Sequence, residues 1–312
     1  MTYRPASVRT SFTLVPLLIL LAVGGGWGAV PSIARYAVTS GIRPMGYVFW
    51  VGVAACALCW AMCLARGRRP RFTLRHIRYY LLSGCTRILV AGFAMYTVLQ
   101  HVPAGMVAIV MGTAPLLTFA AQLALGFERF DRRRGAGIAL GLAGIVAMFA
   151  PGVIAGNGAV PLGWLALGFV TPLAYAFSNI TTDRTRPAGE DSLALTAGVF
   201  LLVAAISLPL ALLMGDFHPL WQRPFDLAEA AMFTHAAIIA VCFFGLYELI
   251  RRTDATFGSQ SVYVTTLTGI LYGMVLLGER PGPSVWIAAA CILGGIVLVN
   301  SGGKVRREAR GA

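Results

Sequence analysis

Long uninterrupted runs of apolar residues follow one another along almost the whole chain, and short segments rich in proline, glycine and charged residues separate them. A helix needs about 20 apolar residues to cross roughly 30 Å of hydrocarbon. The runs lack the period-2 alternation that is typical of barrel strands. We therefore predict an all-α integral membrane protein with ten transmembrane helices, at residues 12–34, 44–65, 79–102, 104–127, 135–155, 163–180, 193–214, 228–250, 257–277 and 285–299.

The composition supports this fold class. Of the 312 residues, 58% are hydrophobic and only 12% are charged, which lies outside the usual range for a soluble domain. The first run, at about 23 residues, is longer than the apolar core of a cleavable signal peptide. We therefore keep it as the first membrane span, and little chain remains for a soluble domain.

The formal net charge of +13 raises the question of a nucleic-acid partner. If the N-terminus is cytoplasmic, 20 of the 25 basic residues fall in cytoplasmic segments, and Arg87 lies inside a span. The opposite side receives only Arg35, Arg43, Arg223 and Arg280. Because cytoplasmic loops carry the excess of Lys and Arg, we predict that both termini are cytoplasmic. No nucleic-acid partner is needed to explain the charge.

An internal repeat appears when the sequence is shifted by 151 residues. Glu128 and Arg129 then fall on Glu279 and Arg280, each pair between the fourth and fifth spans of a five-helix unit. Because five is odd, the second unit enters the membrane from the opposite side. The sequence thus predicts two inverted five-helix repeats, an architecture that is common in secondary transporters with a site near the middle of the bilayer.

The recurring segment runs from Pro115 through Gly126 to Glu128 and a glycine-rich helix, and returns as residues 277–280 with the helix after them. This arrangement resembles the EamA-type branch of the drug/metabolite transporter superfamily. The resemblance covers residues 12–300. It implies EamA-type repeats at 12–150 and 162–300, a central cavity, and transport by alternating access. Thr266 departs from the family's pattern, which often has a proline there.

Arg87 is the clearest charged group inside a predicted span. Charged side chains in the membrane are costly unless they are paired or face water. One interpretation is a cationic anchor for a substrate carboxylate or phosphate. The other is a structural arginine that bonds carbonyl groups at a helix end. A second ionisable group, His235, is interpreted as a packed or interfacial histidine.

Polar residues gather in the ninth span. Ser259, Gln260, Tyr263 and Thr266 are our substrate-binding candidates there, and Thr265 lies on a second polar face. Such residues suit the lining of a cavity, although hydroxyl groups also bond to the backbone of their own helix.

The first and sixth spans carry corresponding features. Trp27 aligns with Tyr175 at an offset of 148, and each span contains a proline, Pro31 or Pro172. Polar or interrupted helices at matching places in the two halves indicate a transporter site. We therefore add Trp27, Tyr175 and Asn179 to the predicted substrate-binding residues, with aromatic core packing as the alternative.

Three glutamates need an explanation. Glu248 lies in the eighth span and is a candidate for proton coupling, but the arginines at 251 and 252 follow it at helical spacing, so a local ion pair is the alternative. We expect Glu128 and Glu279 to cap the helices that begin just after them, because carboxylates favour helix N-termini.

Motifs of ATP-binding loops, zinc proteases and serine hydrolases do not occur in the sequence. We therefore predict a secondary transporter of a small polar metabolite, such as an amino acid, in the bacterial inner membrane, with no enzyme activity, metal or cofactor. Its expected partners are the small-molecule substrate and the lipid bilayer, and we allow for a homodimer. The rivals are a membrane-embedded enzyme or lipid-handling protein, and a non-transporting receptor or assembly subunit.

Overall fold

The computed structural model describes residues 14–128, 130–155, 162–222, 224–253 and 255–311, and these residues form helices and connecting turns without a strand. The helices are α1 (Leu14–Thr39), α2 (Pro44–Ala65), α3 (Leu74–Gly84), the π-helical turn η1 (Cys85–Val90), α4 (Ala91–Leu99), α5 (Ala104–Gly112), α6 (Ala114–Ala124), α7 (Arg132–Ala155), α8 (Leu162–Thr185), α9 (Ser192–Leu213), α10 (Leu227–Arg252), α11 (Ala255–Ser259), α12 (Ser261–Leu277) and α13 (Pro283–Gly311).

Eight helical segments of the described chain are long and apolar enough to cross a membrane. They correspond to eight of the ten predicted spans. The fifth and sixth predicted spans coincide with α7 and α8, which are 24 residues long each but are not among the eight. The all-helical membrane fold is therefore confirmed, whereas the count of ten spans stays a prediction.

Two predicted spans are interrupted. The fourth is divided into α5 and α6 at Thr113, two residues before Pro115. Proline has no N–H to donate, and its ring clashes with the carbonyl group four residues earlier, which favours a break in the helix at this point. The ninth is divided into α11 and α12 at Gln260. The third contains the π-helical turn η1, a rare local widening that often marks functional positions.

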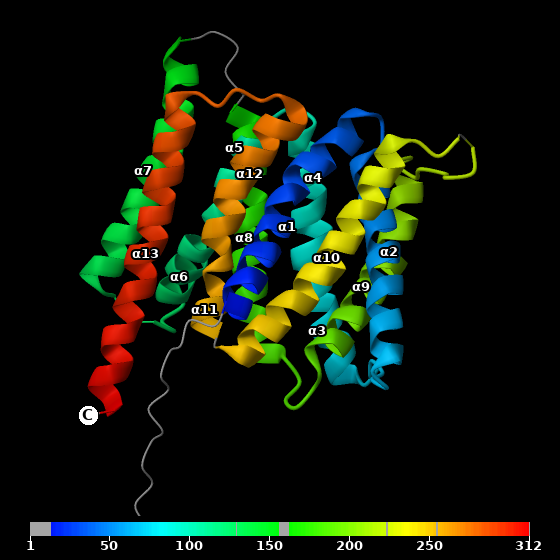
Figure 1. Ribbon diagram of the computed structural model, residues 1–312, viewed down its shortest axis with the longest axis horizontal. Coiled ribbons are helices and arrows are strands. Elements are labelled where there is room, and N and C mark those ends of the chain that lie inside the picture. Colours follow the sequence, from blue (N-terminus) through cyan, green and yellow to red (C-terminus); the bar gives the residue numbers. More distant parts are fainter. Residues whose placement is uncertain (1–13, 129, 156–161, 223, 254, 312) are drawn as a thin grey trace, which may run out of the picture.

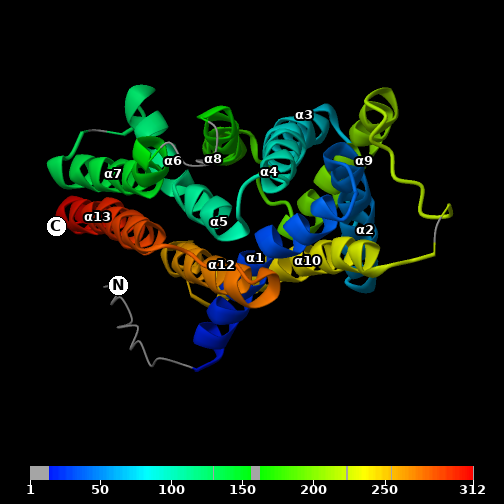
Figure 2. The ribbon, with the colours of Figure 1, turned by 90° about the horizontal axis from the view of Figure 1, so that it is seen from above.

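The helices stand roughly side by side (Figure 1). Helix α1 packs along α10 and α12 in the middle of the bundle, α2 packs along α9, and α7 packs along α13. Seen from above, α7 with α13 and α2 with α9 lie at opposite edges (Figure 2). The C-terminal end of α13 lies at the same end of the bundle as the loop between α2 and α3, which is drawn at the bottom of Figure 1.

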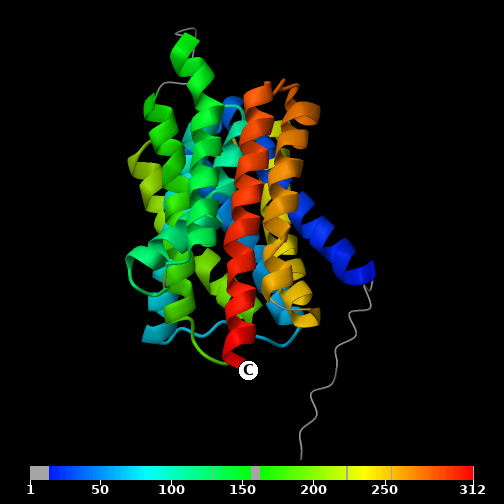
Figure 3. The same ribbon diagram turned by 90° about the vertical axis from the view of Figure 1, so that its left-hand side faces the viewer.

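Close contact between α7 and α13 depends on glycine. Figure 3 faces the edge of the bundle where these two helices run side by side. A Cβ atom added at Gly137 would lie 2.6 Å from the carbonyl oxygen of Gly295, and one added at Gly295 would meet the carbonyl oxygen of Gly137. Small residues let helix backbones approach in this way within a membrane.

We therefore expect Gly295→Ala to destabilise the protein by about 1 to 3 kcal/mol, because the extra methyl group has a backbone atom in its place and forces the helices apart. Gly25→Ala is the matched control, since nothing lies within 4 Å of a Cβ atom added there. Thermal unfolding in detergent measures the difference. Equal melting temperatures for the two variants would contradict the interpretation of this interface.

Candidate functional site

A cavity of about 250 Å³ lies inside the bundle, between helices of both halves of the chain. Its lining is largely apolar and includes five aromatic side chains: Trp27, Tyr96, Tyr175, Phe200 and Phe243. The break between α5 and α6 also borders it, through Gly112, Ala114 and Pro115. Arg87 is the one charged residue in this lining. The arrangement suits a small ligand that carries few polar groups.

The guanidinium group of Arg87 is held by neutral partners. Its Nη1 donates to Oδ1 of Asn179 at 2.8 Å, and its Cζ lies 5.3 Å from the centre of the Tyr175 ring. Nδ2 of Asn179 in turn donates to Oγ1 of Thr118 at 3.3 Å. In the part of the chain that the structure describes, no carboxylate forms an ion pair with Arg87. Its position on η1 turns it toward α8, where both partners lie.

A second cavity of about 560 Å³ adjoins the first. Arg87, Ile88, Phe200 and Phe243 line both of them. The second cavity is also lined by Arg186 at the end of α8 and Ser192 at the start of α9. The connection between α8 and α9 lies at the same end of the bundle as the C-terminal end of α13 (Figure 1). The two cavities therefore extend from the middle of the bundle toward that end.

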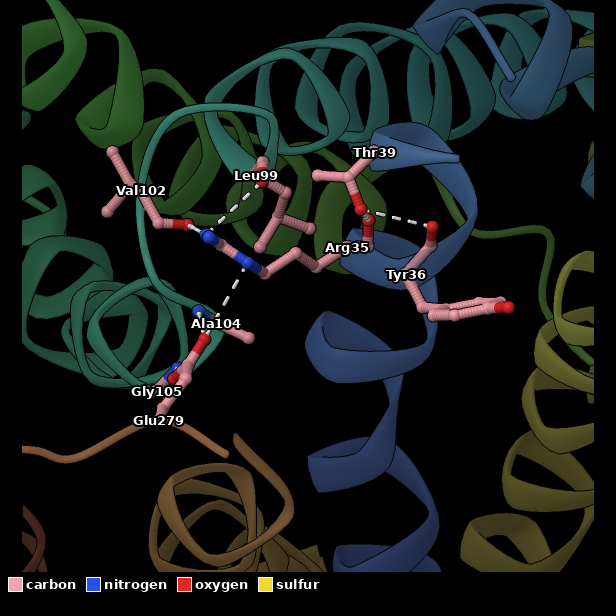
Figure 4. A network of polar contacts seen from close by, with 8 residues as sticks. All are labelled: Arg35, Tyr36, Thr39, Leu99, Val102, Ala104, Gly105 and Glu279. Atoms are coloured by element: carbon pink, nitrogen blue, oxygen red, sulfur yellow. Dashed lines mark hydrogen bonds and ion pairs between the residues drawn. The ribbon is translucent and has the colours of Figure 1, made fainter. Parts of the chain in front are cut away.

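At the opposite end, an ion pair and two backbone contacts join α1, α5 and the loop after α12 (Figure 4). Nε of Arg35 lies 3.7 Å from Oε1 of Glu279. The same carboxylate accepts hydrogen bonds from the backbone N–H groups of Ala104 at 2.6 Å and Gly105 at 2.9 Å. Arg35 also donates to the carbonyl oxygen of Val102. We call Arg35, Glu279, Ala104 and Gly105 the end latch.

The contacts of Glu279 differ from the prediction that it caps the helix following it in the chain. Glu279 caps α5, which begins 175 residues earlier in the chain, and not α13, which follows it. Its carboxylate satisfies N–H groups at a helix start, as expected from the helix dipole, but on a different helix. Glu128 forms an ion pair with Arg134 at 3.3 Å, whereas the first N–H groups of α7 are capped by Asp131.

Five of the predicted site residues line the first cavity: Trp27, Arg87, Tyr175, Asn179 and Thr266. Two others, Ser259 and Gln260, are exposed at the break between α11 and α12 and line neither cavity. The hydroxyl group of Tyr263 accepts from Nδ2 of Asn300 at 3.4 Å, and its side chain packs against a cluster of buried apolar residues from α5, α6, α7, α12 and α13. The substrate-binding role of all eight residues stays a prediction.

Glu248 pairs with Arg252, whose Nε lies 2.6 Å from Oε1 one helical turn away. This contact favours the local ion pair over the coupling role, which stays a prediction. In the described residues, no group of three or more His, Cys, Asp or Glu side chains is placed to hold a metal ion.

His235, which the sequence analysis interpreted as a packed or interfacial histidine, is packed and also lines the first cavity. Its side chain is fully buried, and Nδ1 is hydrogen bonded to the hydroxyl group of Tyr47 at 2.9 Å. Nε2 is buried without a hydrogen-bond partner among the described residues. The apolar neighbours of His235 in the sequence gave no signal for this role. Thr265 Oγ1, in the same lining, is likewise unpartnered.

Comparisons with known proteins agree with this architecture. The chain matches the EamA-like transporter family twice, over residues 14–150 and 162–301. It is 30% identical over 299 residues to the "Uncharacterized inner membrane transporter YedA" of Escherichia coli, which covers 93% of this chain and 92% of that protein. It is 26% identical over 253 residues to the "Probable terminal-alkyne amino-acid exporter" of Streptantibioticus cattleyicolor, covering 77% of this chain and 79% of that protein. A crystal structure with 21% identity has a TM-score of 0.61 and covers 91% of this chain and 95% of its own.

The fold and the internal cavity define a multi-pass helical membrane protein. The chain belongs to the EamA-like transporter family, and the family domain occurs in it twice. It is thus a membrane transporter and not a member of an enzyme family, and its relatives place it in the inner membrane. The resemblance found in the sequence is confirmed.

Proposed function

We propose that this protein is a secondary transporter that moves a small polar metabolite, such as an amino acid or a related compound, across the bacterial inner membrane by alternating access. The observation that carries the proposal is the cavity in the middle of the bundle, which holds a single arginine with neutral partners. An intramembrane charge that faces a cavity indicates a substrate pathway. The relative named as an amino-acid exporter supports the substrate class.

Alternating access follows from the inverted repeats that the sequence predicts. Helices α1 and α8 begin the two family matches and run in opposite directions along the bundle (Figure 1), which supports the inversion. In such transporters the two halves rock around a central site. Glu128 and Glu279 hold corresponding positions in the repeats, 151 residues apart, so the end latch has a potential counterpart at the other end.

The direction in which the cavity opens follows from the charges. The loop between α2 and α3 is rich in arginine and lies at the same end as the C-terminal end of α13. The positive-inside rule assigns this end to the cytoplasm. In our proposal the two cavities then face the cytoplasm, and the end latch closes the external side. An opening to the cytoplasm with a closed external side is the inward-facing state of the proposed cycle.

Transport by purified protein in lipid vesicles tests the proposal. We expect saturable flux of at least one radiolabelled amino acid or related organic acid above the rate in protein-free vesicles. Vesicles with the Arg87→Ala variant serve as the matched control, because they contain the same fold without the charge that lines the cavity. Flux equal to that of protein-free vesicles for every compound of a metabolite library would contradict the function.

A further inference from the structure

Two of the polar residues that line the first cavity, Arg87 and His235, lack a full complement among the described residues. Arg87 carries a charge that no described carboxylate balances, and Nε2 of His235 is buried without a hydrogen bond. Both groups line the same cavity. Buried polar groups in proteins are nearly always hydrogen bonded. A ligand that satisfies both residues therefore needs an anionic group for Arg87 and a hydrogen-bonding group for His235.

We propose that the cavity selects an organic acid with an elongated apolar body, whose carboxylate binds Arg87 and whose far end carries a polar group that hydrogen bonds to His235. This inference rests on the proposed function, because it names the substrate class of the same cavity. Within the proposed class of amino acids and related compounds, it selects related organic acids that contain no ammonium group, and it excludes the zwitterionic amino acids themselves.

The arginine end fixes the charge of the ligand. A guanidinium group has five N–H donors, and in Arg87 one of its nitrogens is engaged with Asn179. The remaining donors can take a carboxylate in a bidentate geometry. Asn179 and Tyr175 hold the guanidinium group in place, which lowers the entropy lost on binding.

The number of charges decides between carboxylate and phosphate. A phosphate ester carries a charge of about −1.5 to −2 at neutral pH, whereas the lining of the first cavity contains one cation. A phosphate would retain uncompensated charge in an apolar site, which is strongly unfavourable. A ligand ammonium group would find no carboxylate in either lining. A singly charged organic acid balances the site.

The volume and the aromatic lining describe the body of the ligand. About 250 Å³ is just below the range of roughly 300 to 1,000 Å³ for ligand pockets, so the ligand is a small metabolite. The aromatic side chains offer ring faces and edges to an apolar or aromatic body. Trp27 and Phe243 meet edge to face, with ring centres 5.8 Å apart.

The histidine end fixes the length. His235 packs against Tyr96, with ring centres 6.0 Å apart. Tyr96 lies nine residues after Arg87 in one continuous helical segment, which corresponds to roughly 13 Å at about 1.5 Å per residue. A ligand that reaches both groups is therefore elongated along the helix axis. The bond to Tyr47 holds the ring of His235 in place, and Nε2 is left as the ring nitrogen without a partner among the described residues.

Four related compounds separate the two contacts: 3-(4-hydroxyphenyl)propionate, 3-phenylpropionate, the methyl ester of the hydroxylated acid, and tyramine. Binding to the purified protein is measured by thermal shift and by tryptophan fluorescence. We expect the hydroxylated acid to bind about five- to tenfold more tightly than 3-phenylpropionate, as for one net hydrogen bond. We expect the ester and the amine to bind at least about tenfold more weakly than the acid, because a hydrogen bond to a charged group is the stronger contact.

The variants assign each preference to one residue. His235→Phe should remove the preference for the hydroxyl group and keep the preference for the acid, and His235→Gln, which retains a donor, should keep part of both. Arg87→Gln should remove the preference for the acid over its ester, and Arg87→Lys should keep part of it. His101→Phe and Arg43→Gln are the matched controls, because neither residue lines the first or the second cavity.

Two outcomes overturn the inference: an ester or amine that binds wild-type protein as tightly as the acid, or a hydroxyl preference that survives in a folded His235→Phe variant. Failure of the proposed function looks different. If the acids bind with these preferences but show no flux in vesicles, the proposed transport function is wrong and the proposed binding site is kept. If the vesicles transport an amine and Arg87→Gln does not change its flux, the proposed transport function is kept and the proposed binding site is wrong.

Discussion

We expect the transport rate at low substrate concentration to fall at least about 30-fold when Arg87 is replaced by alanine. Removing one partner of a buried charge-assisted contact costs about 2 kcal/mol or more, and each 1.4 kcal/mol is a factor of about ten. The initial rate of flux into vesicles, measured at equal protein content, gives the comparison. The loss should come mainly from weaker binding, so a higher substrate concentration should recover part of the rate.

Two further variants distinguish a binding role from a structural one. Arg87→Lys keeps the charge but loses the planar fork of donors, so we expect an intermediate rate. Arg43→Ala removes an exposed arginine that bonds to the carbonyl oxygen of Gly215 at 3.1 Å, and we expect the wild-type rate. A normal rate in a well-folded Arg87→Ala variant would remove Arg87 from the substrate site.

Sequence patterns predicted the helices better than their interruptions. The second span, 44–65, coincides with α2, because Pro44 starts the helix and no break falls within the run. The break between α5 and α6 could have been predicted from Pro115, because proline disfavours a continuous helix. The break at Gln260 had no such signal, because an ordinary polar residue stands there and tertiary packing decides whether the helix continues.

The interruption at Gln260 also explains which candidates of the ninth span reach the cavity. Ser259 precedes the break and Gln260 lies at it, so the single helical face expected through Ser259, Tyr263 and Thr266 does not exist. Only Thr266 lines the cavity. Hydroxyl groups of this segment also bond to their own backbone, as Thr266 does to the carbonyl oxygen of Val262 at 2.9 Å. Selecting residues by polarity alone therefore predicted more cavity-lining residues in the ninth span than the structure has.

Contacts over long sequence distances could not be predicted. Glu279 reaches α5 and Arg35 reaches the same carboxylate from α1, and nothing near either residue in the chain indicates the other. Arg87 was recognisable because charge is rare in the spans. His235 was not, because one unsatisfied ring nitrogen becomes visible only when the surrounding helices are in place.

The second large effect concerns the end latch. Glu279→Ala removes the carboxylate that accepts hydrogen bonds from two backbone N–H groups at the start of α5 and forms the ion pair with Arg35. Loss of such a cap costs about 0.5 to 2 kcal/mol, and in our proposal this energy stabilises only the state closed on the external side. We expect the population to shift toward the outward-facing state by about 2- to 30-fold, since each 1.4 kcal/mol changes an equilibrium about tenfold.

Cysteine labelling reads out this shift. Met111 lines the cavity on α5, so a single cysteine at position 111, in a background without the six native cysteines, reports access from outside. A membrane-impermeant maleimide added externally should label it faster in the Glu279→Ala variant. Glu128→Ala is the matched control at the corresponding position of the other repeat, and it should not raise external labelling. A lower melting temperature with unchanged labelling would make Glu279 a helix cap alone, because a gate must change access when its closing contact is lost.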